Sequence, residues 1–114
     1  MDQYWLLMRR KGDGAMAILN VALEEGFEDD TVVVEVNGRQ VFEGDAVTTR
    51  MQIGLAKSFE VPVQGQEAVV EVRVPSRRVS GRLERPVADR LYVGVSLQDD
   101  KIVFRTSEEP FGYL

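Results

Sequence analysis

Thr31 to Glu43 reads TVVVEVNGRQVFE, and this stretch decides the fold. Runs of β-branched and other apolar residues lie on both sides of Asn37-Gly38. This dipeptide is typical of a two-residue hairpin turn, because both central residues of such a turn need positive φ angles. The sequence therefore predicts two antiparallel strands, with residues 36 and 39 flanking the turn.

The register of this hairpin puts apolar side chains on both of its faces. Val34 would face Val41 on one side of the ribbon, and Val33 would face Phe42 on the other. A ribbon that is apolar on both faces has to be covered on both, by a core on one side and by a further surface on the other.

Residues 15–25, AMAILNVALEE, fit either a helix or a strand. Ala, Met, Leu and Glu favour a helix, but the run is apolar all round rather than striped. We expect a strand, because the apolar runs downstream read as strands and a short turn at 26–30 leads directly into Thr31, as in an antiparallel meander. The residues on one face of this strand would be Ala17, Leu19, Val21 and Leu23.

The rest of the chain repeats short apolar runs separated by turns. About eight strands at a spacing of roughly 8–12 residues predict an all-β fold, an antiparallel β-sandwich of Ig-like or Greek-key type. We expect a single domain over 16–114, with 1–15 as an N-terminal extension. The expected strands after the first hairpin are 47–55, 58–63, 68–74, 79–85, 90–97 and 101–106.

The last two pairs of strands form hairpins with self-consistent registers. In the first of them Glu71 faces Arg82 as an opposite-charge pair, and in the second Val95 faces Phe104 in the core. The core expected from these registers comprises Val34, Val36, Val70, Val72, Leu83, Val93, Val95, Leu97, Ile102 and Phe104.

The composition excludes several classes of site. The 114 residues include no histidine and no cysteine, which removes disulfides, thiolate metal sites and nucleophilic catalysis that depends on either residue. The net charge of −5 argues against nucleic acid and anionic membranes as partners. The one short apolar run near the N-terminus is too short for a secretory signal or a spanning helix, so we expect a cytoplasmic protein.

Four stretches carry a resemblance to known sequences: GFEDDTVVVEVNG at 26–38, GLAKSFEV at 54–61, LYVGVS at 91–96 and EPFGY at 109–113. They resemble signatures of short uncharacterised bacterial β-sandwich proteins whose function is unassigned. The resemblance implies the fold only, and it adds weight to a strand at 15–25. It implies no activity and no catalytic residue.

Acidic residues are expected to gather at one end of the sandwich. If strands at 15–25, 31–36 and 39–43 run up and down, the loops before Thr31 and after Glu43 lie at the same end. Ca²⁺ prefers roughly six to eight carboxylate and carbonyl oxygens, which this end offers. A solvated acidic rim is the simpler interpretation, since no calcium-loop motif is present. The candidate metal ligands are Glu28, Asp29, Asp30, Glu43 and Asp45.

Arginines cluster between residues 73 and 90. Forked guanidinium groups suit phosphate, sulfate or carboxylate groups, including those of an acidic partner. Solvated charges on a hairpin are the simpler interpretation, and no exposed aromatic residue is interleaved with them, as nucleic-acid binding would favour. The candidate anion-binding residues are Arg73, Arg77, Arg78 and Arg82.

The outward face of the leading strands predicts an interaction surface. One cover for it is the chain's own run YWLLM at 4–8, and the other is a second molecule in a symmetric dimer, which we favour. The residues expected on this surface are Trp5, Met16, Ile18, Val33 and Phe42.

These features together predict a non-enzymatic module that acts through a protein surface, binding itself as a homodimer or another protein. The alternative is a calcium-dependent carbohydrate-binding module, with Tyr92, Phe111 and Tyr113 as its sugar platform. No cofactor is expected apart from Ca²⁺ in that alternative. An enzyme would have to use carboxylates or lysines as acid and base, and no spacing singles out such a pair.

Overall fold

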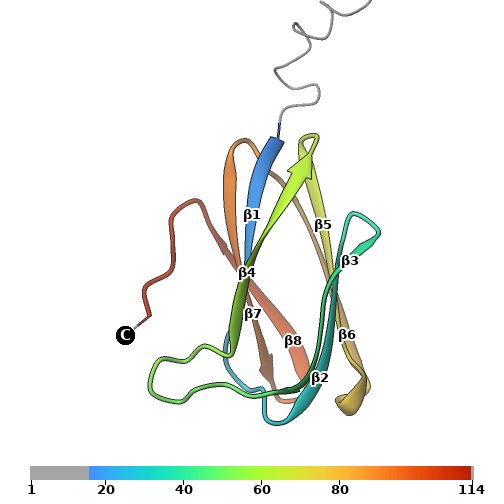
Figure 1. The fold of residues 1–114 in the computed structure, drawn as a ribbon, viewed down its shortest axis with the longest axis vertical. Helices are drawn as coiled ribbons and strands as arrows, with labels where there is room; N and C mark the ends of the chain where they lie inside the picture. Colours follow the sequence, from blue (N-terminus) through green and yellow to red (C-terminus); the bar gives the residue numbers. More distant parts are fainter. Residues whose placement is uncertain (1–15, 114) are drawn as a thin grey trace, which may run out of the picture.

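Two four-stranded sheets face each other around one core in the computed structural model, which describes residues 16–113 (Figure 1). The first sheet has the order β4-β1-β7-β8 and the second has the order β3-β2-β5-β6. The prediction of an all-β sandwich with about eight strands is confirmed. The strands are β1 (Met16–Leu23), β2 (Asp30–Val36), β3 (Arg39–Val47), β4 (Lys57–Gln64), β5 (Glu67–Val74), β6 (Val79–Pro86), β7 (Arg90–Gln98) and β8 (Lys101–Ser107).

The hairpin of β2 and β3 turns at Asn37-Gly38, whose φ angles of 51° and 81° confirm the predicted turn. The predicted register is wrong beyond it, because β3 carries a bulge. Val34 pairs with Phe42 rather than Val41, and Val33 pairs with Glu43. One extra residue in a strand reverses the side to which later residues point. Phe42 therefore packs against the core instead of lying on the outer face.

Within the stretch 15–25, the residues of β1 form a strand, as expected, but the neighbours of this strand are not the predicted ones. β1 pairs with β4 antiparallel and with β7 parallel, and it lies in the other sheet from β2. Its inward residues, Ala17, Leu19, Val21 and Leu23, are buried as predicted. The connection from β1 to β2 therefore crosses between the sheets rather than forming a hairpin.

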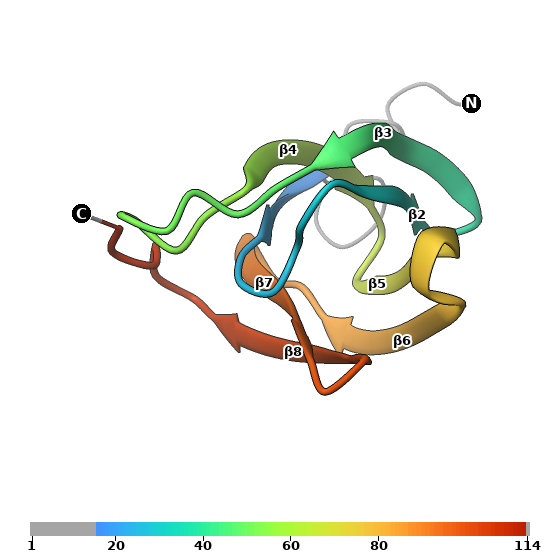
Figure 2. The same cartoon turned by 90° about the horizontal axis from the view of Figure 1, so that it is seen from below.

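The prediction of a strand at 47–55 is also wrong. β3 continues through Gly44 to Val47, and residues 48–56 form a loop that projects from the sandwich (Figures 1 and 2). The hydroxyl groups of Thr48 and Thr49 bond to the backbone of the β1–β2 connection. These bonds hold the loop against another connection, so that it does not continue as a strand. We call residues 48–56 the β3–β4 loop.

The remaining registers agree with the sequence prediction. Glu71 pairs with Arg82 and Val95 with Phe104. The predicted core residues are buried, with Ile102 and Phe104 partly buried against the others. A turn of 3₁₀ helix, η1 (Pro75–Arg77), joins β5 to β6. No helix in the described part of the chain has the length and apolar character needed to span a bilayer.

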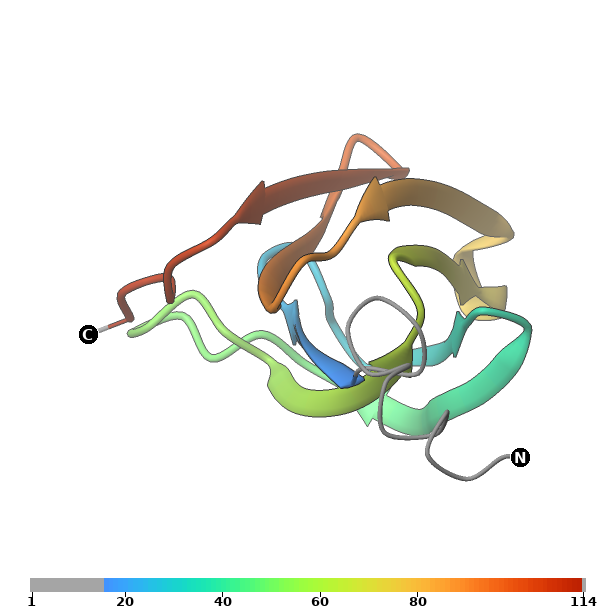
Figure 3. The same ribbon diagram turned by 90° about the horizontal axis from the view of Figure 1, so that it is seen from above.

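Contacts between edge strands of the two sheets close both open sides of the sandwich. On one side Phe42 stacks on Phe59 of β4, with ring centroids 5.1 Å apart. On the other side β6 lies so close to β8 that a Cβ at Gly81 would be 2.8 Å from the Cβ of Ile102. The cross-section is therefore rounded, as Figures 2 and 3 show.

Candidate interaction site

Two carboxylates, Glu24 and Asp30, are the charged side chains that are buried within residues 16–113. They lie at the two ends of the connection from β1 to β2, and only 5% and 2% of their surfaces are exposed. A buried carboxylate is costly unless it is paired and hydrogen-bonded. Their partners therefore show which distant parts of the chain the fold has to bring together.

Asp30 is held entirely by the body of the sandwich. Arg77 of η1 donates from Nε and Nη2 to its two oxygens at 3.0 and 2.9 Å, and the Ser76 hydroxyl donates at 2.7 Å. The backbone N–H of Glu28 donates a further bond at 2.8 Å. Burial by itself raises the pKa of Asp30, but these hydrogen bonds and the charge of Arg77 outweigh it and lower that pKa below its ordinary value.

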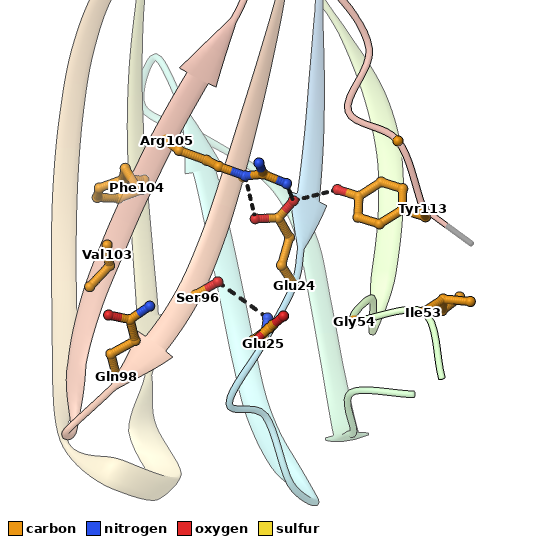
Figure 4. Close-up of a pocket in the computed structure, with 12 residues that line it drawn as sticks. Glu24, Glu25, Ile53, Gly54, Ser96, Gln98, Val103, Phe104, Arg105 and Tyr113 are labelled. Carbon is orange, nitrogen blue, oxygen red and sulfur yellow. Dashed lines mark hydrogen bonds and ion pairs between the residues drawn. The ribbon is translucent and has the colours of Figure 1, made fainter. Parts of the chain in front are cut away.

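Glu24 is held by β8 and by the C-terminal residues (Figure 4). Arg105 donates from Nε and Nη2 to the two carboxylate oxygens at 3.0 and 2.7 Å, and the Tyr113 hydroxyl donates to Oε2. The space for this carboxylate comes from Gly94 of β7, where a Cβ would lie 2.4 Å from Glu24 Oε1. A glycine in the middle of a strand is thus explained by the close approach of another side chain.

Residues 108–113, which we call the C-terminal strap, lie on the outer face of the first sheet. The ring of Phe111 sits under the Arg105 guanidinium, 3.9 Å from its carbon, and meets Tyr92 of β7 edge to face with centroids 6.4 Å apart. Burial, and then the hydrogen bond to Glu24, raise the pKa of Tyr113 above its ordinary value, so the phenol is neutral at pH 7. Phe111 and Tyr113 thus hold the strap against the sheet.

A cleft of about 350 Å³ adjoins the Glu24 carboxylate. Its lining includes Ser96 of β7, Val103 and Arg105 of β8, Ile53 of the β3–β4 loop and Tyr113 of the strap (Figure 4). The cleft thus lies between the loop and the strap, which extend side by side from the sandwich in Figures 2 and 3. Its lining mixes apolar side chains with hydrogen-bonding groups, as polypeptide-binding surfaces do.

The β3–β4 loop is braced at its base. The Thr49 hydroxyl donates to the Glu24 carbonyl at 2.6 Å and accepts from the Phe27 N–H at 3.1 Å, while the N–H of Ala56 donates to the carbonyl of Leu23 at 2.7 Å. Further out, Arg50 and Leu55 form an isolated antiparallel bridge. Between them lies Met51, which is 87% exposed. The fold therefore presents a large apolar side chain on a hydrogen-bonded loop.

The chain has no match among protein-family models, curated proteins or solved structures. The resemblance to short bacterial β-sandwich proteins accordingly stays an expectation. A fold by itself does not define a function, so the residues of the site have to indicate what this chain can bind.

The candidate calcium ligands are only partly brought together. Asp30 is bound to Arg77, while Glu28 and Asp29 are exposed in the adjoining connection. Glu43 lies within β3 and accepts a bond from Gln40, and Asp45 accepts one from Thr31 at 3.4 Å. Within residues 16–113, no group of three or more acidic side chains has an arrangement that could hold a metal ion.

Three of the four candidate anion-binding arginines are bound to carboxylates of the chain. Arg73 pairs with Glu35 at 3.2 Å, Arg77 with Asp30 at 2.9 Å, and Arg82 with Glu84 at 2.6 Å. Arg82 also reaches Glu71 at 3.4 Å, as its register predicted. Arg78 ends η1 with a positive φ of 58° and is exposed. The structure therefore gives the segment mainly internal ion pairs.

The candidate interaction surface is divided between the two sheets, so the expectation of one contiguous patch is wrong. Met16 is 53% exposed and Ile18 is half-buried, both on β1 of the first sheet. Val33 is buried on β2 of the second sheet, and Phe42 packs inward. The predicted patch required β1 to lie beside β2, which it does not. Trp5 lies outside the described residues.

Sequence reasoning missed the joint role of Glu24, Arg105 and Tyr113. It named Tyr113 only as part of a sugar platform with Tyr92 and Phe111. The structure does bring Tyr92 and Phe111 together, but as contacts of the strap. The one local signal was Gly94, a glycine within a strand, which indicates close approach by another group without saying which.

Proposed function

We propose that this chain is a non-enzymatic protein-interaction module whose contact surface is the β3–β4 loop with the cleft beside it. The observation that carries the proposal is Met51, exposed on a loop that is hydrogen-bonded at its base. Methionine adapts its shape to a partner, and a loop that is already ordered loses little conformational entropy on binding.

A second copy of the chain is the partner that this arrangement favours. The loop and the cleft adjoin each other, because Ile53 lines one side of the cleft. A two-fold axis near them would bring the loop of each copy to the cleft of the other, so that the same patch serves both subunits. The proposal thus keeps the predicted homodimer but moves its contact to another surface.

The residues of the cleft are better suited to binding a partner than to catalysing a reaction. Both oxygens of Glu24 accept hydrogen bonds from Arg105, and Oε2 accepts another from Tyr113. The sequence contains no histidine or cysteine to act as base or nucleophile. Two of the charged groups at the cleft, Glu24 and Arg105, are thus engaged with each other.

Sedimentation equilibrium at micromolar concentrations tests this proposal. The unaltered chain is expected to self-associate, and Met51→Glu is expected to weaken association by about tenfold or more, because it places a charge in an apolar contact. Met16→Glu is the matched control, since Met16 is an exposed methionine at the opposite end of β1 from the loop. A monomer at every concentration, or equal effects of the two substitutions, would overturn the proposal.

A further inference from the structure

We propose that the outer face of the first sheet around Glu24 is a binding site for an aromatic C-terminal segment. The chain's own strap occupies this site, and the strap of a second copy can replace it. We call the residues that hold the strap, Glu24, Tyr92, Gly94 and Arg105, the strap site. This inference rests on the proposed function, since it names a segment that the interaction surface takes.

The chemistry of the Glu24 carboxylate limits what the strap site can bind. It is buried, it is satisfied on one side by Arg105, and its Oε2 accepts a bond from the hydroxyl of Tyr113. A desolvated carboxylate that loses a donor is left under-satisfied, so the site favours an occupant that carries a neutral O–H or N–H donor. A tyrosine side chain meets this requirement, and a phenylalanine does not.

The strap makes a second contact, an aromatic one, two residues before the tyrosine. Phe111 contacts both the Arg105 guanidinium and, in an edge-to-face arrangement, the ring of Tyr92. The same Arg105 thus contacts both parts of the strap, stacking on one residue and orienting the carboxylate that binds the other. Recognition therefore requires two aromatic side chains with one residue between them.

The intervening residue carries no such requirement. Among residues 16–113, no atom other than those of Gly112 and its chain neighbours lies within 4 Å of where a Cβ at Gly112 would be. An alanine there would project into open space. The site therefore predicts selectivity at positions 111 and 113 of the bound segment and tolerance at position 112.

Side chains hold the strap to the sandwich. No backbone hydrogen bond joins residues 108–113 to the sheets in the described part of the chain, and the N–H of Glu109 bonds locally to the Ser107 hydroxyl. A segment with few backbone bonds opens at low cost without global unfolding. The strap can therefore leave a site that β1, β7 and β8 keep in place.

Fluorescence anisotropy with a labelled peptide of sequence SEEPFGYL, which copies residues 107–114, tests the inference. The receptor is the full chain carrying Phe111→Ala and Tyr113→Ala, whose own strap no longer competes. We expect this variant to bind the peptide at least about tenfold more tightly than the unaltered chain, in which the tethered strap has a high effective concentration. A peptide with alanine in place of the tyrosine should bind about tenfold more weakly or worse, whereas alanine in place of the glycine should leave binding unchanged.

Equal peptide binding by the variant and the unaltered chain, or indifference to the loss of the tyrosine, would overturn the inference. If circular dichroism shows that the double variant is unfolded, Tyr113→Phe replaces it, since this change removes only the donor. That variant must still bind the peptide more tightly than the unaltered chain does. Peptide binding without self-association would leave the strap site standing and overturn the loop as the interface. Self-association that depends on Met51, without peptide binding, would support the loop as the interface and overturn the strap site.

Discussion

Asp30 and Glu24 are both buried carboxylates, and each accepts hydrogen bonds from two nitrogens of its own arginine. They differ in the other residues that surround them. Every partner of Asp30 belongs to the body of the sandwich, and Arg77 also donates to the carbonyl of Gly26. Glu24 depends on Tyr113, which comes from the strap, and it adjoins a cleft. A buried carboxylate–arginine pair can thus stabilise the body of a fold, or it can form a site from which a segment can be released.

The largest expected effect is on the internal pair. Asp30→Asn removes the charge that balances Arg77, and breaking a buried pair from one side costs about 3 to 5 kcal/mol. We expect the lower end, about 3 kcal/mol by urea unfolding, because Arg77 keeps some contact with water. Asp45→Asn, on an exposed carboxylate, should change stability by no more than about 0.5 kcal/mol. Similar losses in the two variants would contradict the account of Asp30.

The pH dependence of stability in Asp30→Asn is an independent test of the direction in which the pKa of Asp30 is shifted. The pKa of Asp30 is lowered in the folded chain, so the stability it contributes is present above its ordinary value of 3.8 and is lost as the pH falls through the lower folded value. The stability of the unaltered chain should therefore fall more steeply below pH 3.8 than that of Asp30→Asn. Parallel profiles would show that Asp30 has no lowered pKa.

A smaller loss of stability is expected when a side chain is added at Gly94, next to the Glu24 carboxylate. Gly94→Ala would place a Cβ 2.4 Å from Glu24 Oε1, which forces the carboxylate away from Arg105 and Tyr113. Such overpacking costs about 1 to 3 kcal/mol, and here it should also loosen the strap. Urea unfolding measures the first effect, and amide nitrogen relaxation of residues 108–113 measures the second. Gly112→Ala is the control, and a strap that stays ordered in Gly94→Ala would contradict the proposed contact.

The smallest effect separates the strap from the core. Tyr113→Phe removes one hydrogen bond to Glu24, which is worth about 1 kcal/mol or less for an accessible segment. Because the strap lies outside the core, we expect higher mobility of residues 108–113 with little change in the urea midpoint. A loss of global stability as large as that of Asp30→Asn would mean that the strap is part of the cooperative fold, and the contrast between the two carboxylates would fail.

Local chemistry made part of this fold predictable. Asn37-Gly38 selects its turn through its own φ angles, and the registers that set Glu71 against Arg82 and Val95 against Phe104 follow from alternation next to a turn. The bulge near Val41 was not predictable in this way. It reverses the direction of Phe42, which then stacks on Phe59, a residue of the other sheet that lies far away in the sequence.

The candidate site was beyond the sequence for a related reason. Glu24 and Arg105 are separated by 81 positions. The residues next to each of them in the sequence contain no signal that the two side chains meet. They meet because β1 pairs in parallel with β7, next to β8. A parallel pairing of strands so far apart leaves no turn signature, unlike a hairpin.

Apart from the false strand at 47–55, the sequence by itself determined where the strands lie, most of their hairpin registers and the identity of the core. Alternation and turn chemistry act over a few residues, which is why a sequence alone reveals them. Only the tertiary structure decided which strands share a sheet, which arginine each buried carboxylate meets and where the strap lies. Those choices depend on filling one core from two sheets at once, a condition that no short stretch of the chain contains.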